Sequence, residues 1–199
     1  MISIRILAGA FLLLAAPLVR SALVGEVPQI ALDELAAGQV VVKSKAVSGA
    51  PWPRLSLYQV VNAPPAVLKN LFTDYASAPS YTPNLISADI LATNPDGSKD
   101  VQYTTKVPIL GKISYSVRNS YITKGNSYEV DWTLIKSPLA KSSDGSLRIE
   151  PYGQNQTLLC YTNLCVPITS LPGMKEAALG EAKTTVRAIK AEAEKRATN

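Results

Sequence analysis

The residue types that most often perform catalysis or bind metals are scarce in this sequence. None of its 199 residues is a histidine. This excludes a histidine general base, Ser-His-Asp and Cys-His nucleophile systems, and histidine-ligated metal sites. The sequence also shows no carboxylate pair, no glycine-rich phosphate loop and no cluster with metal-ligand spacing. We therefore predict no catalytic residue, no metal site and no cofactor.

Polar and aromatic side chains on predicted strands are the remaining candidates for a functional site. Tyrosine occurs nine times, against two phenylalanines and two tryptophans, and its ring and hydroxyl suit a half-wet cavity as well as a core. Asn119 and Tyr121 fall on the apolar row of a predicted strand, whereas Arg118 and Asp131 fall on the opposite faces. Because isolated polar groups in a pocket more often orient a ligand than catalyse a reaction, we expect a binding protein rather than an enzyme.

The two cysteines, Cys160 and Cys165, lie five residues apart in one predicted strand. This spacing places their side chains on opposite faces, roughly 16 Å apart at ~3.3 Å per residue. A disulfide needs Cα atoms within about 7 Å of each other. We therefore predict free thiols, unless Thr162 and Asn163 form a tight turn.

The first 21 residues have the layout of a secretory signal peptide. A short start with one positive charge precedes an apolar run at residues 6–19, and small or medium residues occupy the cleavage positions at 19–21. This run is shorter than the roughly 20 residues that span a bilayer. We predict cleavage before Ala22 and export to the periplasm or the extracellular space; the alternative is an uncleaved membrane anchor.

The charge balance gives no reason to expect a nucleic-acid partner. Loss of Arg5 and Arg20 with the signal peptide lowers the basic count from 20 to 18 against 15 acidic residues, a net charge of +3. Along the chain the basic residues are spread singly, without a clustered patch. Weak attraction to anionic lipid headgroups is compatible with this balance.

The remaining chain reads as a lead segment, residues 22–50, and one domain, residues 51–199. The lead segment holds a short apolar run at residues 40–42. In the domain, residues 55–62 alternate as a strand. The apolar spacing after Pro64 and Pro65 predicts a helix that ends near residues 75–78, followed by a short turn at residues 83–87.

Residues 88–166 alternate between apolar and polar positions, which predicts an antiparallel meander with one buried face. Its turns are predicted at residues 94–97, 108–111, 124–126, 143–145 and 153–155. A long helix over residues 174–197 then follows. Its apolar stripe is thin near the start, where Ala178, Gly180 and Ala182 are small. Such a helix facing a curved sheet predicts a cavity; the alternative is a solid core filled by large residues such as Trp132.

The order of these elements and several local motifs resemble the START-like superfamily, also called SRPBCC or helix-grip proteins. The polyketide cyclase/dehydrase-like branch is the most similar. Residues 35–42 also look like the segment that precedes the domain in exported bacterial members. The motif residues are Ala63-Pro64 at the helix start, Val67 and Leu71 within it, Asp74-Tyr75 at its end, and Tyr81-x-Pro83 beyond it.

This resemblance implies an α+β fold in which a curved antiparallel sheet wraps around a long C-terminal helix. It also implies a hydrophobic ligand, such as a lipid, sterol, quinone or polyketide, in a cavity between sheet and helix. The expected function is binding or transport of that ligand, and the alternative is a cyclase/dehydrase-like enzyme. Each expected lining residue also has an ordinary core interpretation: Tyr103, Tyr115, Val117, Val130, Trp132, Met174 and Ala178.

The predicted turn at residues 108–111 is unusual because Ile109 and Leu110 are large apolar residues where a polar turn is expected. They either pack on the first helix or lie at the cavity mouth and contact a membrane during ligand exchange. The second alternative makes a transient membrane contact part of the expected function.

Overall fold

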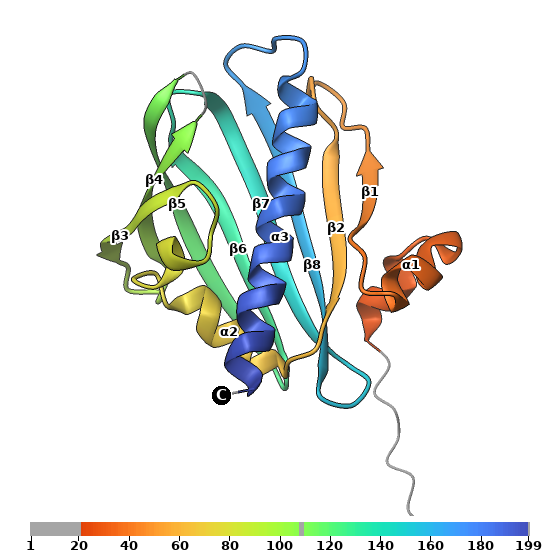
Figure 1. Cartoon of the computed structure of the whole chain (residues 1–199). Coiled ribbons are helices and arrows are strands. Elements are labelled where there is room, and N and C mark those ends of the chain that lie inside the picture. Colours follow the sequence, from red (N-terminus) through yellow and green to blue (C-terminus); the bar gives the residue numbers. More distant parts are fainter. Residues whose placement is uncertain (1–20, 108–109, 199) are drawn as a thin grey trace, which may run out of the picture.

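The computed structural model describes residues 21–107 and 110–198, so the predicted signal peptide lies almost entirely outside it. An eight-stranded antiparallel sheet, in the order β1-β2-β8-β7-β6-β5-β4-β3, curves around the long helix α3 (Figure 1). The predicted α+β helix-grip architecture is confirmed. Within the described residues, no helix combines the length and the hydropathy of a membrane span.

The strands are β1 Val41–Lys45, β2 Arg54–Val61, β3 Leu85–Thr93, β4 Lys99–Val107, β5 Gly111–Lys124, β6 Ser127–Lys136, β7 Ala140–Tyr152 and β8 Gln156–Pro167. The α-helices are α1 Leu32–Ala36, α2 Pro65–Thr73 and α3 Met174–Thr198, and the short 3₁₀ helices are η1 Ala22–Glu26, η2 Gln29–Ala31 and η3 Ala78–Ser80. The first predicted strand and both main predicted helices therefore match β2, α2 and α3 closely.

The turn predicted at residues 143–145 is wrong, because β7 runs through it. Gly145 pairs with Trp132 on β6 and with Asn163 on β8. A Cβ atom at Gly145 would lie 2.4 Å from the Trp132 ring and 2.3 Å from the Thr162 carbonyl oxygen. The glycine thus serves a close approach inside the sheet, and β6 and β7 are connected at residues 137–139 instead. The predicted turn at residues 83–87 is also too long, because β3 begins at Leu85.

Two buried clusters lie on the two faces of the sheet. On the inner face, Leu57, Leu147 and Ile149 pack with α2 and with Val186 and Ile189 of α3. These helix residues belong to the C-terminal half of α3, so the solid core occupies one end of the molecule. The small residues in the first half of α3 leave the other end open for a cavity.

The second cluster lies on the outer face, where the lead segment packs against β2 and β8. Leu23 and Leu35 are fully buried there with Tyr58 and Leu158. Burial of these side chains removes apolar surface from water and fixes the lead segment in place. Figure 1 shows α1 of this segment, in red, beside the β1 edge of the sheet, and β1 itself, in orange, as the edge strand that pairs with β2.

The cysteines are confirmed as free thiols on opposite faces of the continuous strand β8. Cys160 is buried in the outer cluster, whereas Cys165 is half-buried on the inner face. The exception foreseen for a turn at Thr162 and Asn163 does not occur.

Candidate functional site: a cavity under the first half of α3

A cavity of about 500 Å³ lies between the inner face of the sheet and the N-terminal half of α3. The alternation of the strands positions its walls, since every second residue of β4, β5, β6 and β8 points inward. Ala178 and Ala182 of α3 belong to the facing wall, and an alanine methyl group fills little of the space between helix and sheet. The predicted cavity is therefore present because small helix residues face a curved sheet.

Six of the seven predicted lining residues border this cavity: Tyr103, Tyr115, Val117, Val130, Trp132 and Ala178. Met174 does not. It is the first residue of α3, and its sulfur accepts a hydrogen bond from the Leu171 backbone N–H at 3.3 Å. A role of these residues in ligand binding stays a prediction.

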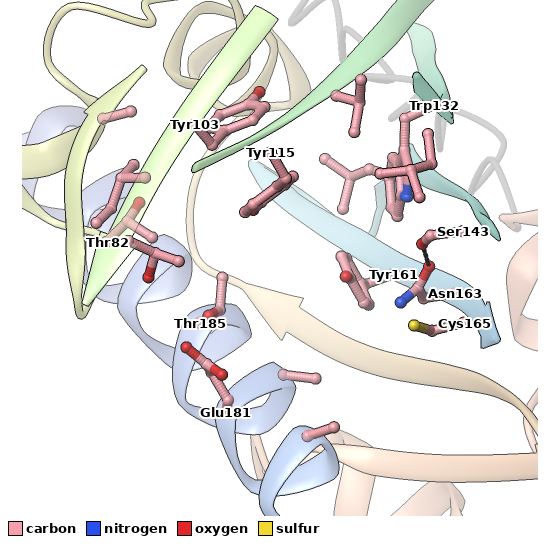
Figure 2. Close-up of a pocket in the computed structure, with 18 of the residues that line it drawn as sticks. Thr82, Tyr103, Tyr115, Trp132, Ser143, Tyr161, Asn163, Cys165, Glu181 and Thr185 are labelled. Atoms are coloured by element: carbon pink, nitrogen blue, oxygen red, sulfur yellow. Dashed lines mark hydrogen bonds between the residues drawn. The ribbon is translucent and has the colours of Figure 1, made fainter. Parts of the chain in front are cut away.

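Several lining residues were absent from the prediction: Tyr161, Asn163 and Cys165 on β8, Thr82 before β3, and Glu181 and Thr185 on α3 (Figure 2). The three β8 residues occupy alternate positions, so strict period-two alternation contained the signal for them. Glu181 and Thr82 depend on how α3 and the α2–β3 connection sit against the sheet, which local patterns do not encode.

Two aromatic pairs shape the cavity walls. The rings of Tyr103 and Tyr115 stack with centroids 5.6 Å apart, and those of Trp132 and Tyr161 lie 5.2 Å apart at a tilt of 31°. Trp132 also covers Gly145, whose missing side chain leaves room for the indole. These contacts restrain the rings, so the cavity has rigid aromatic walls rather than adaptable ones.

A hydrogen-bonded network holds the wall of the cavity near the end of α2. The buried Asn119 amide donates to the Tyr75 hydroxyl at 3.0 Å and to the Tyr103 hydroxyl at 3.3 Å. The Tyr75 hydroxyl is also bonded to that of Tyr121. Both N–H groups of Asn119 are therefore used, and the network positions Tyr103. Asn119 and Tyr121 were expected to orient a ligand; both are bonded to protein hydroxyls here, so that role stays a prediction.

Tyr115 and Tyr161 differ from this network, since neither hydroxyl has a hydrogen-bond partner within the described residues. Burial raises the pKa of both phenols well above the ordinary value of 10. Both therefore stay neutral at physiological pH and offer O–H donors to a ligand. Neither can act as a base near neutral pH.

The charged groups of the cavity lie at its edges. Glu181 is exposed at the rim and has no ion pair among the described residues, and Figure 2 shows it beside Thr82 and Thr185. Lys175 is also exposed and lies 3.5 Å from Glu176. The carboxylate of Asp74 bonds to Ser77 and Arg196. Among the lining residues, the inner walls are thus neutral, apolar and aromatic.

The arrangement can enclose an apolar molecule and donate hydrogen bonds to its oxygens. No group of three potential metal ligands occurs in residues 21–107 and 110–198. The interior phenols could polarise a carbonyl. Burial is the main cause of their raised pKa, and the Glu181 carboxylate at the rim adds to it for both Tyr115 and Tyr161.

Comparison with known proteins supports the fold. No protein-family model and no curated protein matches this sequence. A STAR-related lipid transfer protein from Xanthomonas axonopodis has a similar structure, with a TM-score of 0.67 and 13% identity over 77% of this chain and 93% of the other. A START superfamily protein from Mycobacterium smegmatis gives a TM-score of 0.63 and 18% identity, covering 71% and 97%. An aromatase/cyclase from a Streptomyces species gives 0.58 and 16%, covering 72% and 94%. The resemblance to the START-like superfamily thus holds at the level of the fold.

Proposed function

We propose that this protein binds and carries a hydrophobic small molecule, such as a lipid, sterol, quinone or polyketide, in the cavity under α3. The observation that carries this proposal is the cavity itself, about 500 Å³ lined mainly by apolar and aromatic side chains. This volume lies within the range of small-molecule sites, roughly 300–1,000 Å³. The similar fold of a STAR-related lipid transfer protein supports the same interpretation.

The polar groups of the cavity favour a neutral ligand that carries oxygen acceptors. Tyr115 and Tyr161 present unpaired O–H donors, which match carbonyl or ether oxygens. An anionic headgroup would be repelled by the unpaired carboxylate of Glu181 at the rim. It would also find no cation on the inner walls to compensate its charge. We therefore expect a sterol ketone, quinone or polyketide-like molecule to bind better than a fatty acid anion.

Export and membrane contact belong to the same proposal. Residues 1–21 act as a signal peptide that sends the carrier out of the cytoplasm, and residues 109 and 110 touch a membrane during ligand exchange. Leu110 supports this contact because 56% of its surface is exposed rather than packed on α2. Ile109 lies outside the described residues. N-terminal sequencing of the envelope-fraction protein should show a chain that begins at Ala22.

The alternative is a cyclase/dehydrase-like enzyme, and the similar fold of an aromatase/cyclase favours it as the second candidate. The composition of the inner walls favours a carrier, because cyclization needs a base that accepts a proton near neutral pH and the lining carboxylates, Asp74 and Glu181, lie at the cavity edge. Native mass spectrometry of protein purified from its own host separates the two. A stoichiometric, unmodified apolar molecule supports the carrier, whereas its conversion on incubation supports the enzyme.

Titration of the delipidated protein tests the ligand class. Tyr115→Phe and Tyr161→Phe should each weaken binding of a fluorescent neutral ketone probe about two- to tenfold, the worth of one hydrogen bond. Tyr128→Phe is the matched control, since Tyr128 does not line the cavity. Glu181→Gln should strengthen binding of a fluorescent fatty acid. Parent protein that binds neither probe would contradict the carrier function.

A further inference from the structure

The connections at one end of the sheet share an unusual composition. Because the strands are antiparallel, the β1–β2, β4–β5 and β6–β7 connections and the β8–α3 loop meet at the end where α3 begins, at the top of Figure 1. We call this the apical end. Its described connecting residues, 46–53, 110, 137–139 and 168–173, include prolines and large apolar residues but no acidic residue. Connections at the opposite end, 94–98, 125–126 and 153–155, are built from ordinary polar turn residues.

Large apolar side chains are exposed across the apical end. Leu110 exposes 56% of its surface, Ile168 49% and Leu171 60%. The indole N–H of Trp52 donates to the Ser170 hydroxyl at 3.2 Å, which ties the β1–β2 connection to the β8–α3 loop. Exposed apolar groups on adjoining connections form a surface that is costly to leave in water.

Exposed lysines lie on the strands that lead into and out of the apical connections. The strand and helix residues next to the apical connections include five exposed lysines without an ion pair among the described residues: Lys45, Lys106, Lys112, Lys136 and Lys141. They belong to five different strands, so the fold gathers basic residues that are spread singly along the sequence. Residues that are spread singly along the sequence thus lie at one end of the folded chain.

The strand register is a second observation that favours an anion-binding role for these lysines. Lys106 lies directly opposite Lys112 in the β4–β5 pair, and Lys45 lies directly opposite Arg54 in the β1–β2 pair. Like charges directly opposite each other destabilise a sheet. Arg54 is relieved by an ion pair with Asp144 at 2.8 Å. Lys45, Lys106 and Lys112 have no ion pair among the described residues.

We propose that the apical end docks on a lipid bilayer with anionic headgroups. The lysines contact headgroup phosphates, while Leu110, Ile168 and Leu171 enter the interface between headgroups and acyl chains. A bilayer fits better than a protein partner because apolar and basic groups are interspersed over four separate connections and five strands. The proposal rests on the carrier function and names the surface at which the ligand is exchanged. Trp52, Leu139 and Lys175 border both the cavity and the apical end.

Vesicle co-sedimentation of the protein beginning at Ala22 tests this docking. The protein should sediment with phosphatidylcholine vesicles that contain about one-third phosphatidylglycerol, and poorly with phosphatidylcholine alone. Because a lysine near an anionic surface strengthens binding roughly fivefold, Lys112→Glu with Lys136→Glu should weaken binding more than about 25-fold. Lys124→Glu with Lys195→Glu, at the opposite end, changes the net charge equally and should have a small effect.

Leu110→Ser with Leu171→Ser should also reduce binding, whereas Ile30→Ser, at a 94% exposed site elsewhere, should not.

Three outcomes would overturn the docking proposal: equal binding to both vesicle types, equal loss in both charge-reversal variants, or no vesicle binding at all. The cavity titration in solution is independent of the apical charges. The Lys112→Glu and Lys136→Glu variant should therefore still bind the neutral ketone probe. A protein that binds the probe but no vesicle would retain the carrier function and lose the docking surface, and one that fails to bind the probe would lose the carrier function itself.

Discussion

At the scale of single residues, the two thiols of β8 report separately on the two faces of the sheet. Burial raises the pKa of both Cys160 and Cys165, so both react slowly near neutral pH and faster as the pH rises. Cys165 borders the cavity, whereas Cys160 is fully buried beneath the lead segment. We expect a maleimide to label Cys165 first in the native protein, and a cavity ligand to protect Cys165 alone. Labelling followed by peptide mass spectrometry measures both rates; equal protection of the two thiols would contradict the placement of the cavity.

Gly145 provides a second test at this scale. Its position against the Trp132 ring and the Thr162 carbonyl leaves no room for a methyl group, and overpacking of this kind typically costs about 1–3 kcal/mol. Gly145→Ala should therefore lower the free energy of unfolding by roughly 2 kcal/mol or more, measured by denaturant titration. Gly180→Ala is the control, since nothing lies within 4 Å of its added Cβ. In the helix interior this change should stabilise by about 0.5–1 kcal/mol. A neutral Gly145→Ala would mean that β7 bends away from Trp132.

At the scale of elements, an ion pair between Glu26 and Arg148 adds to the buried contacts that hold the lead segment on the sheet. Arg148 on β7 donates two hydrogen bonds to the Glu26 carboxylate, one of 2.7 Å and one of 2.5 Å. The bonds from Arg148 lower the pKa of Glu26 below its ordinary value of 4.5. A carboxyl whose pKa is lower in the folded state stabilises the protein above its unfolded pKa, and this contribution is lost as the pH falls through the folded value.

Glu26→Gln should therefore remove part of the acid sensitivity. Above about pH 5, the variant should be less stable than the parent by roughly 1 kcal/mol, the size of a half-exposed ion pair. Once the pH has fallen below the folded pKa of Glu26, the two proteins should converge, because Glu26 is then protonated in both states. Denaturant midpoints across this pH range give the comparison. A constant difference at all pH values would show that Glu26 contributes by packing rather than by charge.

The main helices and strands were predictable from the sequence, whereas several contacts between them were not. Alternation and helix periodicity predicted β2, α2, the meander and α3, because each is a local pattern that matches its burial. Ser-Asp-Gly at residues 143–145 is a typical turn sequence, so a turn was predicted there. The prediction was wrong because Gly145 lies within β7 and pairs with Trp132 across the strands. Met174 was assigned to the cavity by periodicity, but a helix end can turn its first residue away. The lysines of the apical end became visible only when the strand order brought five strands together.

At the scale of the whole molecule, the solid core and the cavity divide α3 into two unequal halves. Val186, Ile189 and Ala193 are buried in the core, whereas the earlier half of the helix faces the cavity with small side chains. A helix segment with few buried contacts opens at a lower free energy than one in the core. In delipidated protein, amide hydrogens of residues 178–185 should therefore exchange faster than those of residues 186–195.

A bound ligand fills the cavity and stabilises only the native state, so it should slow exchange in the first half of α3 and on the cavity strands. Hydrogen exchange with mass spectrometry, with and without the neutral ketone probe, measures this difference. Equal protection along the whole helix in the delipidated protein would mean that side chains fill the space beneath its first half, and that the chain carries no ligand there.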